Sequence, residues 1–225
     1  MLGGGMYNYY SSPTVSNCIF SGNVATSDGG GIYYFDMSSS TVRNCTFSGN
    51  LAANSGGGIF FNSSSPRVAN SIFWGNAASS EGNEIHTVYS ANPRFRYCDI
   101  AGSGGSGPDW NGSFGIDGGG NIDVDPLFAD PSARDFHLQS RAGRFSARPG
   151  GPLWVFDTHT SPCIDTGDPA TAVGFEEQDN GHRINIGAFG GTHQASKSSN
   201  IPGDANHDGH VNLLDLALVA DHWLQ

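Results

Sequence analysis

One ten-residue motif recurs along the chain: TVSNCIFSGN at residues 14–23, TVRNCTFSGN at residues 41–50 and RVANSIFWGN at residues 67–76. A degenerate fourth copy, RFRYCDIAGS, occupies residues 94–103. Each copy follows a glycine-rich segment, and these segments begin at Gly3, Gly29, Gly56 and Gly82. The period is therefore 26 or 27 residues. Self-similarity at such a period indicates a repeat architecture, in which one structural unit stacks on the next.

The composition of the unit distinguishes between two repeat architectures. A leucine-rich repeat also has a period of about 20–29 residues, but residues 1–103 contain only Leu2 and Leu51. Each unit instead holds short apolar segments separated by Gly, Asn, Ser and Pro. In the second unit these segments are residues 32–34, 41–42 and 45–47. We therefore predict an all-β fold, a parallel β-solenoid with three short strands per turn and rungs about 4.8 Å apart.

Stacking in register turns equivalent residues into columns. Three apolar columns are expected to fill the interior: Met6/Ile32/Ile59/Ile85, Val15/Val42/Val68/Phe95 and Phe20/Phe47/Phe73/Ile100. Asparagine tolerates the left-handed backbone region and its amide can bond along a stack, so we expect a tight bend at Asn17, Asn44 and Asn70. The glycine columns mark other corners, where φ is positive. A further column predicts buried thiols, or a disulfide between adjacent rungs, at Cys18, Cys45 and Cys98.

Composition and charge exclude several classes of protein. The 33 glycines among 225 residues keep no three-residue period, which excludes a collagen helix. A net charge of −11 repels a phosphate backbone, so we expect no nucleic-acid partner. No stretch of about 18 apolar residues is present, so no transmembrane segment is expected. Glycines follow Met1 and Leu2 directly, so no secretory signal is readable. We therefore expect that amino-terminal rungs are missing from this sequence.

Four segments are expected along the chain. Residues 1–103 hold the regular rungs. Residues 104–195 are expected to begin with a flexible Gly-rich surface loop at 104–120 and to continue as irregular last rungs that cover the open end of the stack. Residues 196–202 form a polar linker, and residues 203–225 form a tail of different composition.

The tail has the spacing of a calcium-binding loop. Calcium takes roughly six to eight oxygen ligands, and Gly209 stands where such a loop turns sharply around the ion. The expected ligands are the side chains of Asp204, Asn206, Asp208, Asn212 and Asp215 and the backbone carbonyl of His210. An amphipathic helix over residues 213–224 is expected to follow. We therefore predict that the tail binds Ca²⁺; a solvated acidic tail is the alternative.

The repeated motifs, together with their glycine triplets, resemble the right-handed parallel β-helix family, the pectate-lyase-like superfamily. Four later segments are similar to the carboxy-terminal parts of secreted β-helix proteins of planctomycete-type bacteria: GNIDVDPLFADP (120–131), DFHLQS (135–140), SPCIDTGDP (161–169) and INIGAFGGT (184–192). The resemblance implies a right-handed helix, an extracellular or cell-surface location, and a polysaccharide or surface glycan as partner. The same helix carries lyases, hydrolases, epimerases and adhesins, so the resemblance leaves the activity open.

The tail resembles a dockerin type I repeat, because its last ligand is Asp215 rather than Glu and no helix enters the loop. That family pairs two such repeats and binds cohesin modules, which attach enzymes to scaffolds or cell surfaces. A cohesin-like partner of the tail is therefore implied, although only one repeat stands in residues 203–225.

No complete catalytic motif is found, so the catalytic residues stay unassigned and it stays open whether the protein is an enzyme. Elimination on a uronic-acid polymer needs a cation and a basic side chain, and the candidates are Arg94, Arg96, Arg141, Arg144 and Arg148. Glycoside hydrolysis needs paired carboxylates, and the candidate pairs are Asp123/Asp125 and Asp165/Asp168. Solvent-exposed arginines, carboxylates that shape bends and a structural His182 are the favoured interpretation.

A row of aromatic residues follows the first apolar column by one position. Because side chains alternate along a strand, we expect this row to point outward on successive rungs and to stack against sugar rings. Its members are Tyr7, Tyr33, Phe60 and His86. A row that merely stabilises the sheet by stacking on itself is the alternative.

Three functions remain from the sequence. The first is an extracellular carbohydrate-associated β-helix, binding or processing polysaccharide, with a calcium-binding tail for attachment. The second is a structural or adhesive surface protein without catalysis. The third is a fragment of a polysaccharide lyase or glycoside hydrolase, for which a cleft lined with arginines or paired carboxylates on one helix face would be the supporting observation.

Overall fold

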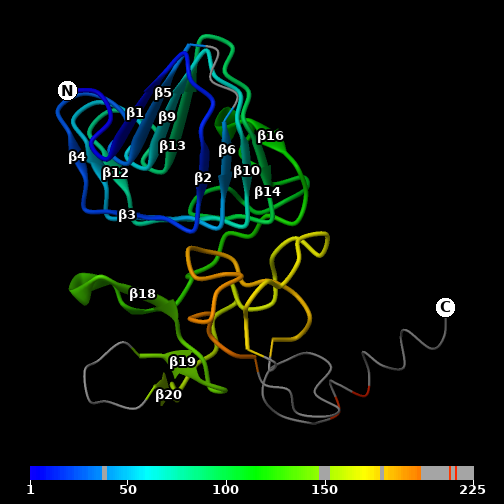
Figure 1. The fold of residues 1–225 in the computed structure, drawn as a ribbon. Coiled ribbons are helices and arrows are strands. Elements are labelled where there is room, and N and C mark those ends of the chain that lie inside the picture. Colours follow the sequence, from blue (N-terminus) through cyan, green and yellow to red (C-terminus); the bar gives the residue numbers. More distant parts are fainter. Residues whose placement is uncertain (37–39, 147–152, 178–179, 199–212, 214–215, 217–225) are drawn as a thin grey trace.

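The computed structural model describes residues 1–36, 40–146, 153–177, 180–198, 213 and 216. Within these ranges the fold is an all-β parallel solenoid of about four turns, as predicted (Figure 1). The expected calcium ligands lie outside the described residues: Asp204, Asn206, Asp208, His210, Asn212 and Asp215. Of the helix expected over residues 213–224, Leu213 and Leu216 are described, with helical backbone and exposed side chains.

The regular turns build four parallel sheets. Sheet 1 consists of β1 (Met6–Tyr9), β5 (Ile32–Phe35), β9 (Ile59–Asn62) and β13 (Ile85–Val88). Sheet 2 consists of β2 (Thr14–Ser16), β6 (Thr41–Arg43), β10 (Arg67–Ala69), β14 (Arg94–Arg96) and β16 (Ile116–Asp117). Sheet 3 consists of β3 (Ile19–Ser21), β7 (Thr46–Ser48), β11 (Ile72–Trp74) and β15 (Asp99–Ile100). Sheet 4 consists of β4 (Val24–Ala25), β8 (Leu51–Ala52) and β12 (Ala77–Ala78).

The prediction of three strands per turn is therefore wrong by one. Each sheet 4 strand has only two residues, as in β4 (Val24–Ala25), and two residues are too few to show an alternating apolar pattern.

The three predicted apolar columns fill the interior. Strands pair in register, so that Val15, Val42 and Val68 stack directly on one another. Ring stacking continues along the column that contains Phe47, whose ring centroid lies 4.9 Å from Phe20 and 4.6 Å from Phe73. The members from the second to the fourth rung are at most 1% exposed. This column packing is the main apolar core of the solenoid.

The asparagine column forms the bend between sheets 2 and 3, as predicted, because Asn17, Asn44 and Asn70 have φ values of 51°, 49° and 48°. The expectation that these amides bond along the stack is wrong. The amide of Asn17 donates to the carbonyl oxygens of Ala188 and Gly190, at 3.0 and 2.9 Å. The column therefore holds a distant part of the chain against the solenoid.

A different asparagine column bonds along the stack. It follows the second glycine corner, where Gly22, Gly49 and Gly75 have positive φ. The amide of Asn23 donates to Oδ1 of Asn50 at 2.9 Å, and that of Asn50 donates to Oδ1 of Asn76 at 2.8 Å. The amide of Asn76 donates to the carboxylate of Glu84, which ends the ladder. Asn50, Asn76 and Glu84 are at most 5% exposed, so the ladder satisfies polar groups within the interior.

Residues 104–120, where the sequence predicts a Gly-rich surface loop, close the end of the solenoid. A single-turn 3-10 helix, η1 (Gly112–Phe114), places Phe114 in the core at 7% exposure. The ring of Trp110 packs 6.1 Å from Phe95, and its indole nitrogen donates to the carbonyl of Gly115. The segment covers the last apolar rung, which would otherwise face water.

Residues 123–198, here called the side region, do not cover the open end of the stack as predicted. One short connection continues the solenoid, because Ile122 bridges to Asp99 of β15. Beyond it, β17 (Phe128–Asp130) and β18 (Asp135–Leu138), joined by η2 (Pro131–Ala133), form an antiparallel hairpin. A second hairpin pairs β19 (Arg144–Phe145) with β20 (Trp154–Val155). In Figure 1 this region lies beside the solenoid at the asparagine bend.

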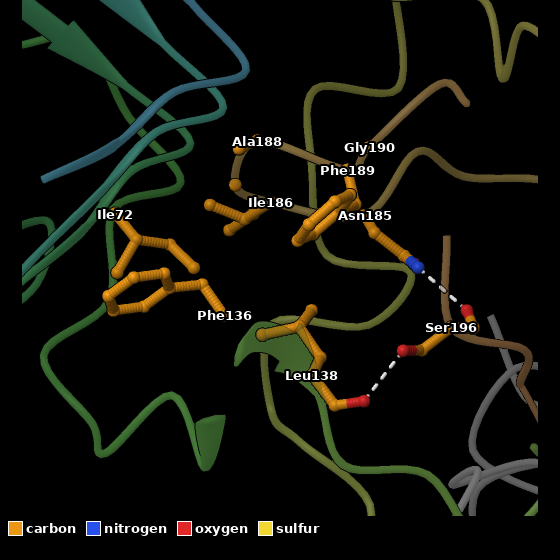
Figure 2. A pocket seen from close by; sticks show the side chains of 10 residues that line it. Ile72, Phe136, Leu138, Asn185, Ile186, Ala188, Phe189, Gly190 and Ser196 are labelled. Carbon is orange, nitrogen blue, oxygen red and sulfur yellow. Dashed lines mark hydrogen bonds between the residues drawn. The ribbon is translucent and has the colours of Figure 1, made fainter. Parts of the chain in front are cut away.

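A second apolar core joins the side region to the solenoid. Ile72 of β11 points from the solenoid toward Phe136 and Ile186 (Figure 2). The amide of Asn185 donates to the carbonyl oxygen of Ser196, and the hydroxyl of Ser196 donates to the carbonyl oxygen of Leu138 (Figure 2). These two hydrogen bonds lie at the edge of this core. All the main joining residues are buried, so the side region and solenoid share a packed interface.

All four cysteines are described, and all four are free thiols. Burial raises the pKa of Cys45 and of Cys98 to about 12, so both stay protonated and act as small apolar side chains. No helix in the described ranges is long and apolar enough to cross a membrane.

Candidate anion-binding groove

A groove of about 330 Å³ runs along the outer face of sheet 2. Valine and phenylalanine of the sheet point inward, so the residues on either side of them point outward. Four of these outward residues are arginines: Arg43, Arg67, Arg94 and Arg96. The opposite wall belongs to the side region and includes Asp168 and Thr171.

The strand register sets the spacing of the arginines. Arg67 and Arg94 occupy equivalent positions on neighbouring strands, so their backbones are about one rung, ~4.8 Å, apart. Arg43 and Arg96 occupy the other outward column and have Ala69 between them. The small alanine leaves room between two long cationic side chains.

The groove concentrates positive charge in an acidic chain. Four of the ten Lys and Arg residues line it, although the net charge is −11. Arg96 pairs with Asp168, whose Oδ2 lies 3.3 Å from Nε. Arg43, Arg67 and Arg94 are exposed and form no ion pair with any described residue. Their guanidinium groups are available to an anionic ligand.

The asparagine bend positions the far wall of the groove. Oδ1 of Asn70 accepts the backbone N–H of Asp168 at 2.8 Å. The Asn70 amide donates to the hydroxyl of Thr171 at 3.4 Å. The carboxylate of Asp168 also accepts the N–H of Ala170, so the side chain is fixed on both sides. These contacts hold Asp168 at 7% exposure beside Arg96.

An aromatic ring supports the cationic end of the groove. The guanidinium carbons of Arg96 and Arg183 lie 5.3 and 5.7 Å from the centroid of the Tyr97 ring. Arg183 in turn donates to the carbonyl oxygens of Thr166 and Gly167, just before Asp168. The arrangement restricts Arg96 before any ligand arrives.

Residues 2–121 match the family described as right handed beta helix region. The chain belongs to this β-helix family. No curated protein and no solved structure was found to match the chain. The match covers the four sheets and the closing segment and ends where the β-helix gives way to the side region. The arginine wall of the groove therefore lies in the β-helix region, whereas Asp168 and Thr171 lie beyond it.

The β-helix brings together only some of the arginines considered as bases. Arg94 and Arg96 lie in the groove. Arg144 is enclosed by Asp135 and Asp157, at 3.2 and 3.1 Å, and Arg141 donates to the carbonyl of Thr158. Arg148 lies outside the described residues.

Sequence reasoning missed Arg43 and Arg67. Their signal was nevertheless present, because both are immediate neighbours of the inward valines at residues 42 and 68. Outward positions in register on adjacent rungs must share one face.

Two of the carboxylates considered for glycoside hydrolysis, Asp123 and Asp125, accept backbone N–H groups at bends. Asp123 accepts the N–H groups of Gly102 and Gly104, at 3.1 and 2.9 Å. Asp125 accepts the N–H of Leu127. His182 is an exposed turn residue with φ of 60°. Within the described ranges, no group of three or more His, Cys, Asp and Glu side chains is placed to hold a metal ion.

The aromatic row lies on the outer face of sheet 1, but most of it is not accessible. Ring centroids are 5.5 Å apart for Tyr7 and Tyr33, 4.9 Å for Tyr33 and Phe60, and 5.2 Å for Phe60 and His86. Tyr33 and Phe60 are only 4% and 7% exposed, because neighbours in the stack cover both ring faces. Tyr7, at 45%, is accessible, and His86 is half-buried beside a groove of about 560 Å³. The expectation of a continuous accessible row is therefore wrong at Tyr33 and Phe60.

Proposed function

We propose that this protein is an extracellular, carbohydrate-associated β-helix whose arginine groove binds an anionic polysaccharide. The observation that carries the proposal is the gathering of Arg43, Arg67, Arg94 and Arg96 in one groove, three of them without an ion-pair partner among the described residues. In a chain of net charge −11, exposed arginines would otherwise be expected to pair with the abundant carboxylates.

The chemistry of arginine favours sugars that carry carboxylate or sulfate groups. A guanidinium presents a planar set of donors that matches these groups with two parallel hydrogen bonds. Arginines on successive rungs form a ladder, and a ladder suits a polymer with charges at regular intervals better than a single small anion. Asp168 narrows the groove on one side and would repel an anion there, so the ligand is expected to lie toward Arg67 and Arg94.

The experiment is affinity electrophoresis in gels that contain polygalacturonate or alginate. We expect retardation of the wild type that decreases with added salt, because the contacts are ionic. The double variant Arg67→Gln/Arg94→Gln should bind at least about tenfold more weakly, which corresponds to ~1.4 kcal/mol. Arg134→Gln is the matched control, because Arg134 is exposed and lies on the hairpin away from sheet 2. Equal retardation of the wild type and the double variant would contradict the proposal.

Elimination is a second candidate activity, favoured by the same cleft. Arg94 or Arg96, in its deprotonated form and in the presence of a cation, would take the proton from the carbon next to the sugar carboxylate. The glycosidic C–O bond at the neighbouring carbon would break as a C=C bond forms, and the leaving sugar oxygen would take up a proton from water. Release of unsaturated oligosaccharides from polygalacturonate with added Ca²⁺ is the measurement. Binding without unsaturated product would favour the binding role, and absence of both would favour the structural or adhesive role.

We further propose that the tail binds Ca²⁺ and serves for attachment, with a cohesin-like module as its partner. The support is the ligand spacing from Asp204 to Asp215 in the sequence. Calorimetric titration of the wild type and of Asp204→Ala with Ca²⁺ is the test. Equal heats from the two proteins would overturn the ligand assignment.

A further inference from the structure

We propose that Asp168 determines which class of anionic polysaccharide the arginine groove binds: polymers in which acidic and uncharged sugars alternate, rather than polymers in which every sugar is acidic. This role of Asp168 rests on the function proposed for the groove, to which it adds a specificity-determining residue. Asp168 and Thr171 lie on the wall that the side region supplies, opposite the arginines of sheet 2.

The carboxylate of Asp168 keeps Arg96 from a ligand. Oδ2 of Asp168 lies 3.3 Å from Nε of Arg96, and the side chain of Asp168 is only 11% exposed. The carboxylate also accepts the N–H of Ala170 at 2.9 Å, and the backbone N–H of Asp168 donates to Asn70. A ligand that drew Arg96 away would leave a nearly buried carboxylate without its cation, which is strongly unfavourable. We therefore expect the ion pair to persist in the complex, so that Arg96 offers no free charge.

The ion pair leaves an uncharged place beside the remaining arginines. Arg67 and Arg94, one rung apart, are close enough for both guanidinium groups to bind one acidic group of a ligand. A step of about 6.6 Å along β14 then leads from Arg94 to the neutralised Arg96. Along the solenoid axis, a step of one rung leads from Arg43 to the uncharged Ala69. Each step is comparable to the length of one sugar unit, so an acidic sugar at the free arginines places its neighbour where no free cation stands.

The groups at this place suit an uncharged sugar. The carboxylate of Asp168 can accept hydrogen bonds from the hydroxyl or amide groups of a sugar, but it repels a second carboxylate. The hydroxyl of Thr171 accepts the amide of Asn70 at 3.4 Å and keeps its own proton for donation. An uncharged sugar would therefore find an acceptor and a donor, whereas an acidic sugar would meet the charge of Asp168.

The test compares two polymers in affinity electrophoresis at equal ionic strength: hyaluronan, in which acidic and uncharged sugars alternate, and alginate, in which every sugar is acidic. We expect the wild type to bind hyaluronan at least about threefold more tightly than alginate. Asp168→Asn can still accept the N–H of Ala170, but it removes the charge and releases Arg96. Binding of alginate should therefore strengthen by about tenfold and that of hyaluronan by less, so that the order of the two polymers reverses. Asp109→Asn is the matched control, because it removes an exposed carboxylate that does not line the groove, and it should keep the wild-type order.

A second measurement needs only the wild type. Phenylglyoxal modifies accessible guanidinium groups, and mass spectrometry identifies the modified arginines. Hyaluronan should protect Arg67 and Arg94 from modification. Arg96 should react at the same slow rate with and without the polymer, because Asp168 already engages its guanidinium. Protection of Arg96 by the same factor as Arg94 would show that Arg96 binds the ligand, and would overturn the proposal.

The outcomes separate this role of Asp168 from the function on which it rests. If neither polymer retards the wild type, both the anion-binding groove and the role of Asp168 are overturned. If alginate retards the wild type as strongly as hyaluronan, or if Asp168→Asn keeps the wild-type order, only the role of Asp168 is overturned and the groove remains a site for anionic polysaccharide.

Discussion

At the scale of single residues, Glu84 is a carboxyl group buried in the interior of the solenoid. It ends a ladder of asparagine amides, and its two oxygens accept both the backbone N–H and the side-chain amide of Asn76. Burial raises its pKa to about 7, although the hydrogen bonds from Asn76 oppose that rise. The group thus titrates near neutral pH inside a packed interior.

The pH dependence of stability follows from this pKa. The folded pKa, about 7, lies above the ordinary value of 4.5, so the folded state binds the proton more tightly than the unfolded state. The contribution of this carboxyl group to the free energy of unfolding is fully present below pH 4.5, the ordinary pKa, and is lost as the pH rises through the folded pKa of about 7. Glu176 and Asp99, whose pKa values burial also raises to about 7, act in the same direction. We therefore expect a lower free energy of unfolding at pH 8 than at pH 5, measured with urea.

The variant Glu84→Gln isolates the contribution of one carboxyl group. Glutamine resembles the protonated side chain, so the difference in unfolding free energy between pH 5 and pH 8 should shrink by on the order of 1–3 kcal/mol. Glu177→Gln, on an exposed side chain, is the control and should leave the difference unchanged. An unchanged difference in Glu84→Gln would show that the group does not titrate in this window.

Two glycines make different demands on the rung. A Cβ at Gly57 would lie 2.4 Å from the carbonyl oxygens of Ala77 and Asn83, both backbone atoms of the next rung. Gly75 has φ of 73° but open space around it. We expect Gly57→Ala to cost more than about 4 kcal/mol or to prevent folding, and Gly75→Ala to cost about 1–2 kcal/mol. Thermal unfolding of the two variants measures the difference, and equal melting temperatures would contradict the close rung contact.

At the scale of elements, the closing segment 104–120 is the part that stabilises the solenoid end. Phe114 is buried on the last rung, so Phe114→Ala should cost about 3–5 kcal/mol in unfolding free energy. Phe156→Ala, at a ring that is 72% exposed, should cost much less. Urea unfolding of both variants tests this, and a mobile surface loop at 104–120 would make the two costs equal.

At the scale of the whole molecule, Asn70 connects the solenoid to the side region and the groove wall. Asn70→Ala removes the acceptor of the Asp168 N–H and the donor to Thr171, and places alanine at φ of 48°. We expect amide hydrogen exchange at Asp168 and its neighbours to be faster in this variant than in the wild type, whereas exchange in the interior strand β9 should not change. Ser16→Ala, which changes an outward side chain of sheet 2, is the control. Exchange rates at Asp168 that stay at the wild-type level would exclude this role.

The sequence predicts the solenoid well because every rung repeats the same inward residues. Val42 and Phe47 are recognisable as interior simply from their equivalents at residues 15, 20, 68 and 73. The side region has no such repetition, and its contacts join residues more than 140 positions apart, such as Asn44 and Gly190. No local pattern reports such a contact.

The sequence predicts some of the residues of the candidate groove but not their arrangement. Arg94 and Arg96 stood among the sequence candidates, and Arg43 and Arg67 follow from the same register rule once outward columns are traced. The sequence offers Asp168 as one of a carboxylate pair or as a bend residue. Its place opposite Arg96 depends on how the side region packs, and no local pattern predicts that packing.

The four free thiols can report the order in which parts of the molecule unfold. Cys18, on the first rung, is partly accessible, whereas Cys45, Cys98 and Cys163 are buried in different parts of the structure. A slow alkylating reagent would therefore label them in the order in which their surroundings come apart. If the rungs peel away from the first turn, Cys45 is labelled before Cys98; if the side region detaches first, Cys163 leads. Mass spectrometry that identifies the labelled cysteines over time thus distinguishes unfolding rung by rung from detachment of the side region.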